Sequence, residues 1–136
     1  MSRAESYKER GNELLRKSKP LEAIESYTSA IELNPNSHIY YGNRSQARLN
    51  IKDFEGALKD AIKSIELDQS YTKAYYRKAV ANKGLGNYEA ALTDFQRLQN
   101  SNPNNKGYEN QIKECEILMF EKEYQECRWG LGDYGL

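Results

Sequence analysis

The sequence has few of the residues that build metal sites and disulfides. It holds one histidine, His38, and two cysteines, Cys115 and Cys127, which are 12 residues apart. On one helix this separation is about 18 Å, too far for a disulfide. No CxxC pair exists, and one histidine gives no metal-ligand spacing. We expect no metal or cofactor, a surface histidine, cysteines that are at least half-buried, and a reducing compartment, the cytoplasm and also the nucleus.

Long apolar runs and an excess of one charge are also missing. No apolar run approaches the roughly 20 residues that span a bilayer, and Met1–Glu5 lacks the apolar core of a signal peptide. The 20 basic and 20 acidic residues cancel, whereas a general nucleic-acid binder carries a basic excess. We therefore expect a soluble intracellular protein that binds neither membranes nor nucleic acids.

Catalytic motifs are absent as well. The chain has no Ser/His/Asp set, no glycine loop that could cradle a phosphate and no cluster of metal ligands. The sequence therefore predicts that this chain is not an enzyme.

The chain does contain a segment that recurs every 34 residues, in copies at 4–37, 38–71 and 72–105. Position 4 is always tyrosine (Tyr7, Tyr41, Tyr75), and positions 8 and 20 are always small (Gly11, Ser45, Ala79 and Ala23, Ala57, Ala91). Position 24 is Tyr27, Ala61 or Phe95. Small residues let two helices cross closely, and aromatic residues at positions 4 and 24 fill the space around the crossing. The three position-4 tyrosines are therefore predicted core residues.

Turn residues divide each copy into two helices. Gly84 and Gly86 suit the end of a first helix, and Pro20 suits the first turn of a second helix, where its missing N–H costs nothing. Asn34-Pro35 and Asn102-Pro103 end second helices.

A helix-turn-helix of 34 residues with this pattern and a late proline resembles the tetratricopeptide repeat (TPR). The resemblance covers Ala4 to Asn105, about three quarters of the chain, with Gln69 at a position where the family has proline. It implies an all-α fold in which three TPR repeats stack as a right-handed superhelix.

Residues 106–128 form a predicted capping helix, because a stacked array would otherwise leave an apolar face in water. Its apolar residues at helical spacing are Tyr108, Ile112, Cys115 and Met119, and the face is broadened by Ile117, Leu118, Phe120 and Tyr124. Residues 129–136 contain three glycines and are a predicted flexible tail.

The first helix of each repeat has a polar face. Positions 2, 5, 6, 9, 12 and 13 fall within an arc of about 120°. Across the three repeats this arc carries five bases (Lys8, Arg16, Lys73, Arg77, Lys83) against two acids (Glu5, Glu9), with amides between them. This basic, hydrogen-bonding groove suits a short extended peptide with carboxylates. In the family, the arc lines the concave surface.

Five residues of the arc match the two-carboxylate clamp of co-chaperone TPR domains in position and type: Lys8, Asn12, Asn43, Lys73 and Arg77. The resemblance implies that the groove holds the C-terminal Glu-Glu-Val-Asp (EEVD) of Hsp70 or Hsp90 chaperones. The lysines and asparagines would bind the two carboxylates of the terminal aspartate, and Lys73 and Arg77 would reach further up the peptide. Further candidate groove contacts are Gln46, Tyr76, Val80 and Lys83.

Residues 39–45, 74–79 and 114–124 look most like the N-terminal domain of TPR-type serine/threonine phosphatases, in which the domain restrains its own catalytic domain until a chaperone binds. The phosphatase motifs Gly-Asp-x-His-Gly and Gly-Asn-His-Glu are absent. Three functions stay open: a chaperone adaptor, a chaperone-recruiting and autoinhibitory domain of a larger phosphatase, and a TPR scaffold that binds an internal peptide motif unrelated to EEVD. The preferred chaperone and the oligomeric state are not predicted.

Overall fold

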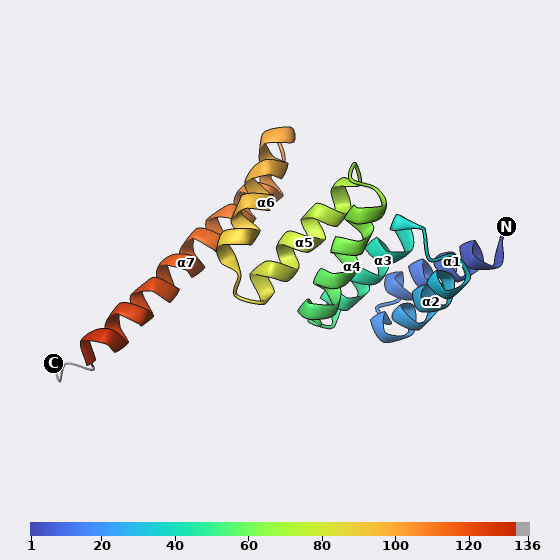
Figure 1. The fold of residues 1–136 in the computed structure, drawn as a ribbon, viewed down its shortest axis with the longest axis horizontal. Coiled ribbons are helices and arrows are strands. Elements are labelled where there is room, and N and C mark those ends of the chain that lie inside the picture. Colours follow the sequence, from blue (N-terminus) through green and yellow to red (C-terminus); the bar gives the residue numbers. More distant parts are fainter. Residues whose placement is uncertain (133–136) are drawn as a thin grey trace.

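The computed structural model describes residues 1–132, and within this range it contains helices, turns and no strand (Figure 1). The helices are α1 (Arg3–Arg16), α2 (Pro20–Leu33), α3 (His38–Asn50), α4 (Phe54–Leu67), α5 (Thr72–Gly84), α6 (Tyr88–Ser101) and α7 (Lys106–Gly132). The first six form three antiparallel hairpins, each packed against the next, in the stacked arrangement expected of the repeats. No helix of this range is long and apolar enough to cross a membrane.

The turn inside each hairpin has the same geometry in all three repeats. Its middle residue has a positive φ, 59° at Ser18, 62° at Lys52 and 84° at Gly86. In the first turn the Lys19 amide donates to the Leu14 carbonyl (2.8 Å) and the Ser18 amide donates to Leu15 (3.0 Å), which together make a Schellman motif. The same pair of bonds closes the other two turns. Two of the three turns therefore hold a non-glycine residue in the left-handed region, at a cost in stability.

Small residues at position 8 are required by the aromatic residue at position 24. A Cβ placed on Gly11 would lie 2.5 Å from the ring of Tyr27, which is fully buried. Phe95 is equally buried, in a cluster with Ala79 and Ala91. The predicted pairing of small and aromatic positions is thus confirmed at these crossings.

The sequence predicted that the position-4 tyrosines are core residues. In the structure they are only half-buried. Tyr75 donates from its hydroxyl to the Gln69 carbonyl (3.0 Å), and Lys78 lies over its ring. A tyrosine at the rim of the hairpin can bury its ring and keep its hydroxyl near water. The buried tyrosine of α3 is instead the preceding residue, Tyr40, with 2% of its surface exposed.

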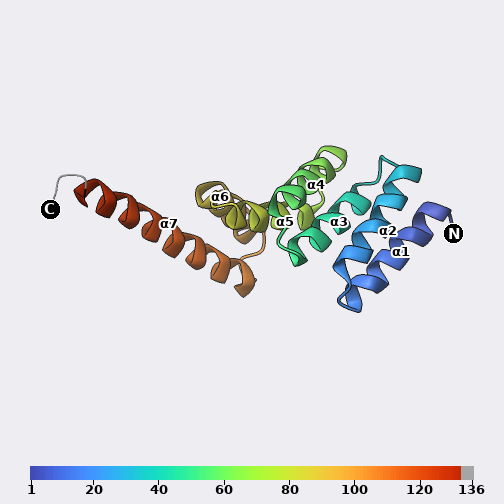
Figure 2. The ribbon, with the colours of Figure 1, turned by 90° about the horizontal axis from the view of Figure 1, so that it is seen from below.

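Helix α7 covers the last hairpin with its N-terminal half, where Ile112 and Cys115 are buried against α5 and α6. It ends at Gly132 rather than at residue 128, so the predicted flexible tail is wrong for 129–132, and residues 133–136 lie outside the described range. Extending an existing helix is easy compared with nucleating one, and each glycine costs only about 1 kcal/mol. Cys127 is exposed, contrary to expectation, because this part of α7 projects beyond the stack (Figures 1 and 2).

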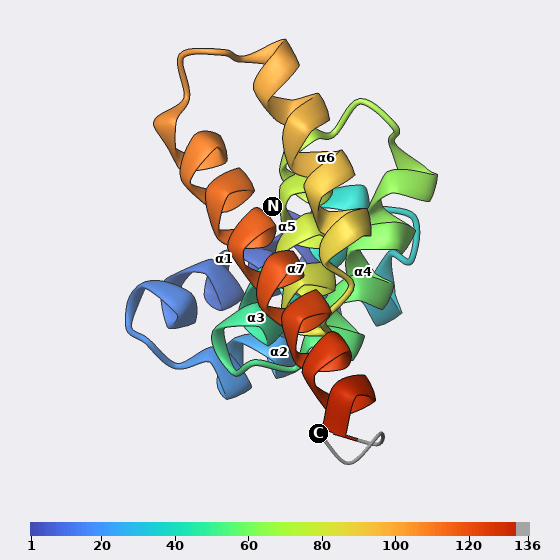
Figure 3. The same cartoon turned by 90° about the vertical axis from the view of Figure 1, so that its left-hand side faces the viewer.

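Seen from the α7 end, the hairpins lie behind that helix, with α1 and α2 farthest along the stack (Figure 3). Helices α1, α3 and α5 contact one another directly, α1 with α3 and α3 with α5. The first helices of the three repeats therefore share one face of the superhelix.

Candidate peptide-binding groove

The groove predicted from the sequence runs over α1, α3 and α5. Asn12 on α1 and Asn43 on α3 meet directly, with the Asn43 amide donating to the Asn12 carbonyl oxygen at 3.1 Å. Arg77 reaches across from α5, since its Nη1 lies 3.1 Å from where a Cβ on Gly42 would stand. The stack thus joins two of the five clamp residues directly and brings a third, Arg77, against Gly42, the residue before Asn43.

The orientation of Asn12 is set by a buried tyrosine. The Tyr27 hydroxyl donates to the Asn12 carbonyl oxygen at 2.6 Å. Burial raises the pKa of Tyr27 to about 12, despite the opposing charges of Arg77 and Arg16, so the hydroxyl stays protonated and keeps its role as donor. With two donors on its oxygen, Asn12 presents its NH₂ group as the donor for a ligand.

Lys8 lies between two acids on its own helix. Its Nζ is 2.8 Å from Glu5 and 3.3 Å from Glu9, and its side chain is 18% exposed. The hydrogen bond with Glu5 is the main cause that raises the pKa of Lys8. The pKa of Glu5 is lowered in return, first by Lys8 and then by the Tyr40 hydroxyl, which donates to it. A ligand carboxylate that approached Lys8 would therefore compete with Glu5 and Glu9 for its ammonium group.

Arg77 has the opposite surroundings. Its Nη1 is buried and has no hydrogen-bond partner among the described residues. Buried donors without partners are rare in folded proteins, so this one calls for an explanation. Lys73, one turn before Arg77 on α5, is exposed. Both side chains line the same open pocket, where Lys73 is open to an acceptor and Arg77 has an unused donor.

An open pocket of about 360 Å³ lies beside Arg77. Four of the nine predicted groove residues line it: Gln46, Lys73, Tyr76 and Arg77. Its other walls are Thr72 and three residues from the connection into α7, namely Asn105, Gly107 and Tyr108. The sequence placed Tyr108 in the cap alone, because the repeat pattern does not show that the start of α7 returns to the first helix of the third repeat.

Two of the candidate contacts face α7 instead. Val80 packs against the core cluster that contains Phe95 and Cys115. The Lys83 ammonium donates to Gln111 at 2.8 Å and pairs with Glu114, both on α7. The predicted ligand role of Lys83 remains a prediction, and the structure gives this lysine a partner within the chain.

The sequence reasoning missed two buried acids at position 23 of the second and third repeats. Asp60 accepts two hydrogen bonds from Arg44, each of 2.8 Å, and a third from Arg48 at 3.0 Å. Lys78 pairs in the same way with Asp94 at 3.2 Å. The recurrence of a base at position 7 and an acid at position 23 was the available signal. These pairs tie together the two helices of the second hairpin and those of the third.

The described residues contain no cluster of three or more histidine, cysteine, aspartate or glutamate side chains able to hold a metal ion. The arrangement offers hydrogen-bond donors and positive charge over three neighbouring helices.

Comparison with known proteins agrees with this architecture. Models of the tetratricopeptide repeat match residues 4–37 and 72–105. Rat serine/threonine-protein phosphatase 5 is 40% identical over 127 residues, which are 93% of this chain and 26% of the phosphatase. The chain thus spans about a quarter of the length of this curated relative.

Two solved structures share the fold and contain chaperone peptides. One is the second TPR domain of human RPAP3 in complex with the HSP70 peptide SGPTIEEVD, with a TM-score of 0.78, 34% identity, and coverage of 84% of this chain and 95% of that domain. The other is the first TPR of Spaghetti (RPAP3) bound to the HSP90 peptide SRMEEVD, with a TM-score of 0.79, 32% identity, and coverage of 86% and 95%. The helix pairs, the repeat period and these similarities together show that the chain belongs to the tetratricopeptide repeat family.

Proposed function

We propose that this chain is a peptide-capture module that binds the free C-terminal EEVD sequence of Hsp70 or Hsp90 chaperones. The observation that carries the proposal is the contact of Asn12 with Asn43, together with the unpartnered Nη1 of Arg77 beside Gly42. Two similar structures hold chaperone peptides that end in this sequence. Donors from three repeats converge where such a peptide would lie.

Each residue has a distinct part in the proposed complex. Asn12 and Asn43 donate amide protons to the carboxylates of the terminal aspartate, and Lys8 and Lys73 supply positive charge on either side. Arg77 donates to the peptide further from its end, which satisfies the buried Nη1. Gln46 and Tyr76 line the pocket next to Arg77 and contact an upstream side chain.

The strength of binding follows from the number of contacts. A hydrogen bond to a charged group contributes roughly 1.5–3 kcal/mol, and ordering a disordered tail costs about 2–5 kcal/mol. Several clamp contacts then leave about 7–8 kcal/mol, which corresponds to a Kd near the micromolar range. Because the contacts are charged and partly exposed, affinity should fall as salt is added.

We propose that the module recruits chaperones and does not itself catalyse a reaction. The rat relative is a phosphatase, and this chain corresponds to about a quarter of it. The module therefore acts either as an adaptor or as the regulatory domain of a larger phosphatase, with that enzyme's own catalytic domain as a second partner. Its place of action would be the cytoplasm and nucleus, where the chaperones are encountered.

The test is a titration with a fluorescent Met-Glu-Glu-Val-Asp pentapeptide, followed by anisotropy. Arg77→Ala and Lys8→Ala should each weaken binding at least tenfold, because each removes a charge-assisted contact. Arg16→Ala is the matched control, since Arg16 lies in the same arc but pairs with Glu13 at 2.6 Å and is exposed. Equal binding by all four proteins would overturn the clamp.

A further inference from the structure

The C-terminal half of α7 has no partner within the stack. Every side chain from Phe120 to Arg128 is exposed, whereas Ile112 and Cys115 in the first half are buried. Figures 1 and 2 show this part of the helix extending beyond α6. A cap needs only the first half, so the second half is available for another contact.

The apolar residues of α7 change sides where the helix leaves the stack. The inner set, which faces α5 and α6, is Tyr108, Ile112, Cys115 and Met119. The outer stripe is Ile117, Phe120, Tyr124 and Cys127, and its first three members are 58%, 69% and 58% exposed. At about 100° per residue the two sets lie roughly 130° apart around the helix. The spacing of the outer stripe, three, four and three residues, is that of the a and d positions of a coiled coil.

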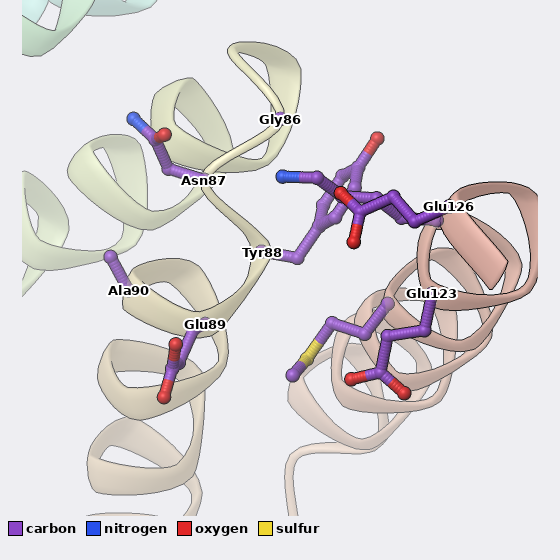
Figure 4. Close-up of a pocket in the computed structure, with 9 residues that line it drawn as sticks. Gly86, Asn87, Tyr88, Glu89, Ala90, Glu123 and Glu126 are labelled. Atoms are coloured by element: carbon purple, nitrogen blue, oxygen red, sulfur yellow. The ribbon is translucent and has the colours of Figure 1, made fainter. Parts of the chain in front are cut away.

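Beyond Met119 the inner side of α7 is charged, with Lys122 beside Glu123 and Glu126. Figure 4 shows Glu123 and Glu126 extending from α7 and Tyr88 and Glu89 coming from α6, around a pocket of about 480 Å³. A second open hollow lies between Leu85 and Tyr88 of the stack and Phe120 and Tyr124 of α7, but these two α7 side chains stay 69% and 58% exposed. The stack therefore leaves most of their apolar surface uncovered.

We propose that the outer stripe docks a basic amphipathic helix of a partner protein, an interaction that is separate from peptide capture in the groove. The edges of the stripe carry the evidence for the partner's charge. Glu116 and Glu123 lie at g positions on one side, and Glu121 lies at an e position on the other, with Arg128 as the base at the next e position. A helix with apolar a and d residues and lysine or arginine at its edges would complement both features.

A second copy of the chain fits this surface less well. Two parallel copies would set Glu116 of one against Glu121 of the other and Glu123 against Arg128, and two antiparallel copies would set Glu116 against Glu123 and Glu121 against Arg128. Either arrangement of two copies thus keeps a like-charge contact, which lysine at the edge positions of a different helix would replace with an attraction. We therefore expect the chain to be monomeric and the stripe to take a different helix.

The test uses two synthetic helical peptides of about three heptads with leucine at a and d, one with lysine at e and g and the other with glutamate there. The lysine peptide should bind the full chain at least tenfold more tightly than the glutamate peptide. Phe120→Asp should abolish this binding and leave the EEVD affinity unchanged. Ile62→Asp on α4 is the matched control, because Ile62 is likewise an exposed large apolar residue, at 42%.

A charge swap makes the test independent of the apolar contacts. The triple variant Glu116→Lys, Glu121→Lys, Glu123→Lys should reverse the preference, so that it selects the glutamate peptide. Equal binding of the two peptides to the wild-type chain, or binding insensitive to Phe120→Asp, would overturn the proposal. So would a dimer in sedimentation equilibrium that Phe120→Asp dissociates, because it would assign the stripe to a second copy.

Discussion

The groove over α1, α3 and α5 is basic, whereas the outer stripe of α7 is apolar with mainly acidic edges, and the two are built in different ways. The groove takes one or two side chains from each of three repeats, and its geometry depends on partners such as Tyr27 behind Asn12. The stripe lies on one helix and depends on its own spacing alone. Changes inside the stack should therefore alter stability and the groove together, and changes on the projecting half of α7 should alter neither.

The largest difference between the two regions should come from removing an acid. Asp60→Ala leaves Arg44 and Arg48 without their shared carboxylate inside the second hairpin and should lower the free energy of unfolding by about 3 kcal/mol. Glu121→Ala on α7 should change it by less than about 0.5 kcal/mol. Urea denaturation followed by circular dichroism measures both. Similar values for the two variants would show that the buried pair does not hold the hairpin together.

A tyrosine hydroxyl offers a smaller and more local comparison. Tyr27→Phe removes the donor to Asn12 and should cost about 1 kcal/mol of stability. It should also weaken EEVD binding about fivefold, because Asn12 loses its fixed orientation. Tyr124→Phe on the outer stripe should affect neither quantity. Unchanged peptide affinity in Tyr27→Phe would mean that Asn12 is oriented by Asn43 alone.

The turns of the stack, which α7 lacks, should allow a gain in stability. Lys52 has a φ of 62°, so Lys52→Gly relieves left-handed strain and should raise the free energy of unfolding by about 0.5–1 kcal/mol. Gly86→Ala, at the equivalent turn with a φ of 84°, should lower it by a similar amount. Thermal denaturation of both variants checks the pair. A loss of stability in Lys52→Gly would show that the lysine side chain outweighs the strain.

The smallest effect concerns Glu5 and is visible through pH. Lys8 holds the pKa of Glu5 below its usual value in the folded chain, so the ionised carboxylate stabilises the fold above about pH 4.5 and ceases to do so as pH falls through the folded-state pKa. The wild type should melt slightly above Glu5→Gln at pH 7, and the difference should shrink as the pH falls below about 4.5 and the carboxylate takes up its proton. A difference that persisted at low pH would show that the charge of Glu5 is not its source.

Much of this architecture could be predicted from the sequence, because it depends on residues that recur at the same positions of a 34-residue repeat. The small residues Gly11 and Ala79 and the aromatic residues Tyr27 and Phe95 predict close helix crossings, and the structure confirms them. The same period gave the positions of the groove residues, of which Asn12 and Asn43 are hydrogen-bonded and Arg77 reaches Gly42 beside Asn43.

The features that the sequence did not predict depend on contacts between different parts of the chain, such as α7 and the third repeat. Tyr108 joins the pocket beside Arg77, and Lys83 turns to Glu114, only because α7 folds back over α5. Tyr75 is half-buried because its hydroxyl donates a hydrogen bond to the Gln69 carbonyl. The pattern of residue types in the repeat does not show this contact. The glycines near the end of α7 suggested a loose tail, but a helix already formed continues through them to Gly132.

The central claim is that the groove recognises a free C-terminal carboxylate. The most direct measurement compares the affinity of Met-Glu-Glu-Val-Asp as the free acid with that of the same peptide amidated at its C-terminus. We predict a Kd near the micromolar range for the acid and an affinity at least tenfold lower for the amide. The amide lacks one of the two carboxylates that Asn12, Asn43 and the flanking lysines would bind. Equal affinity for the two peptides would contradict the claim.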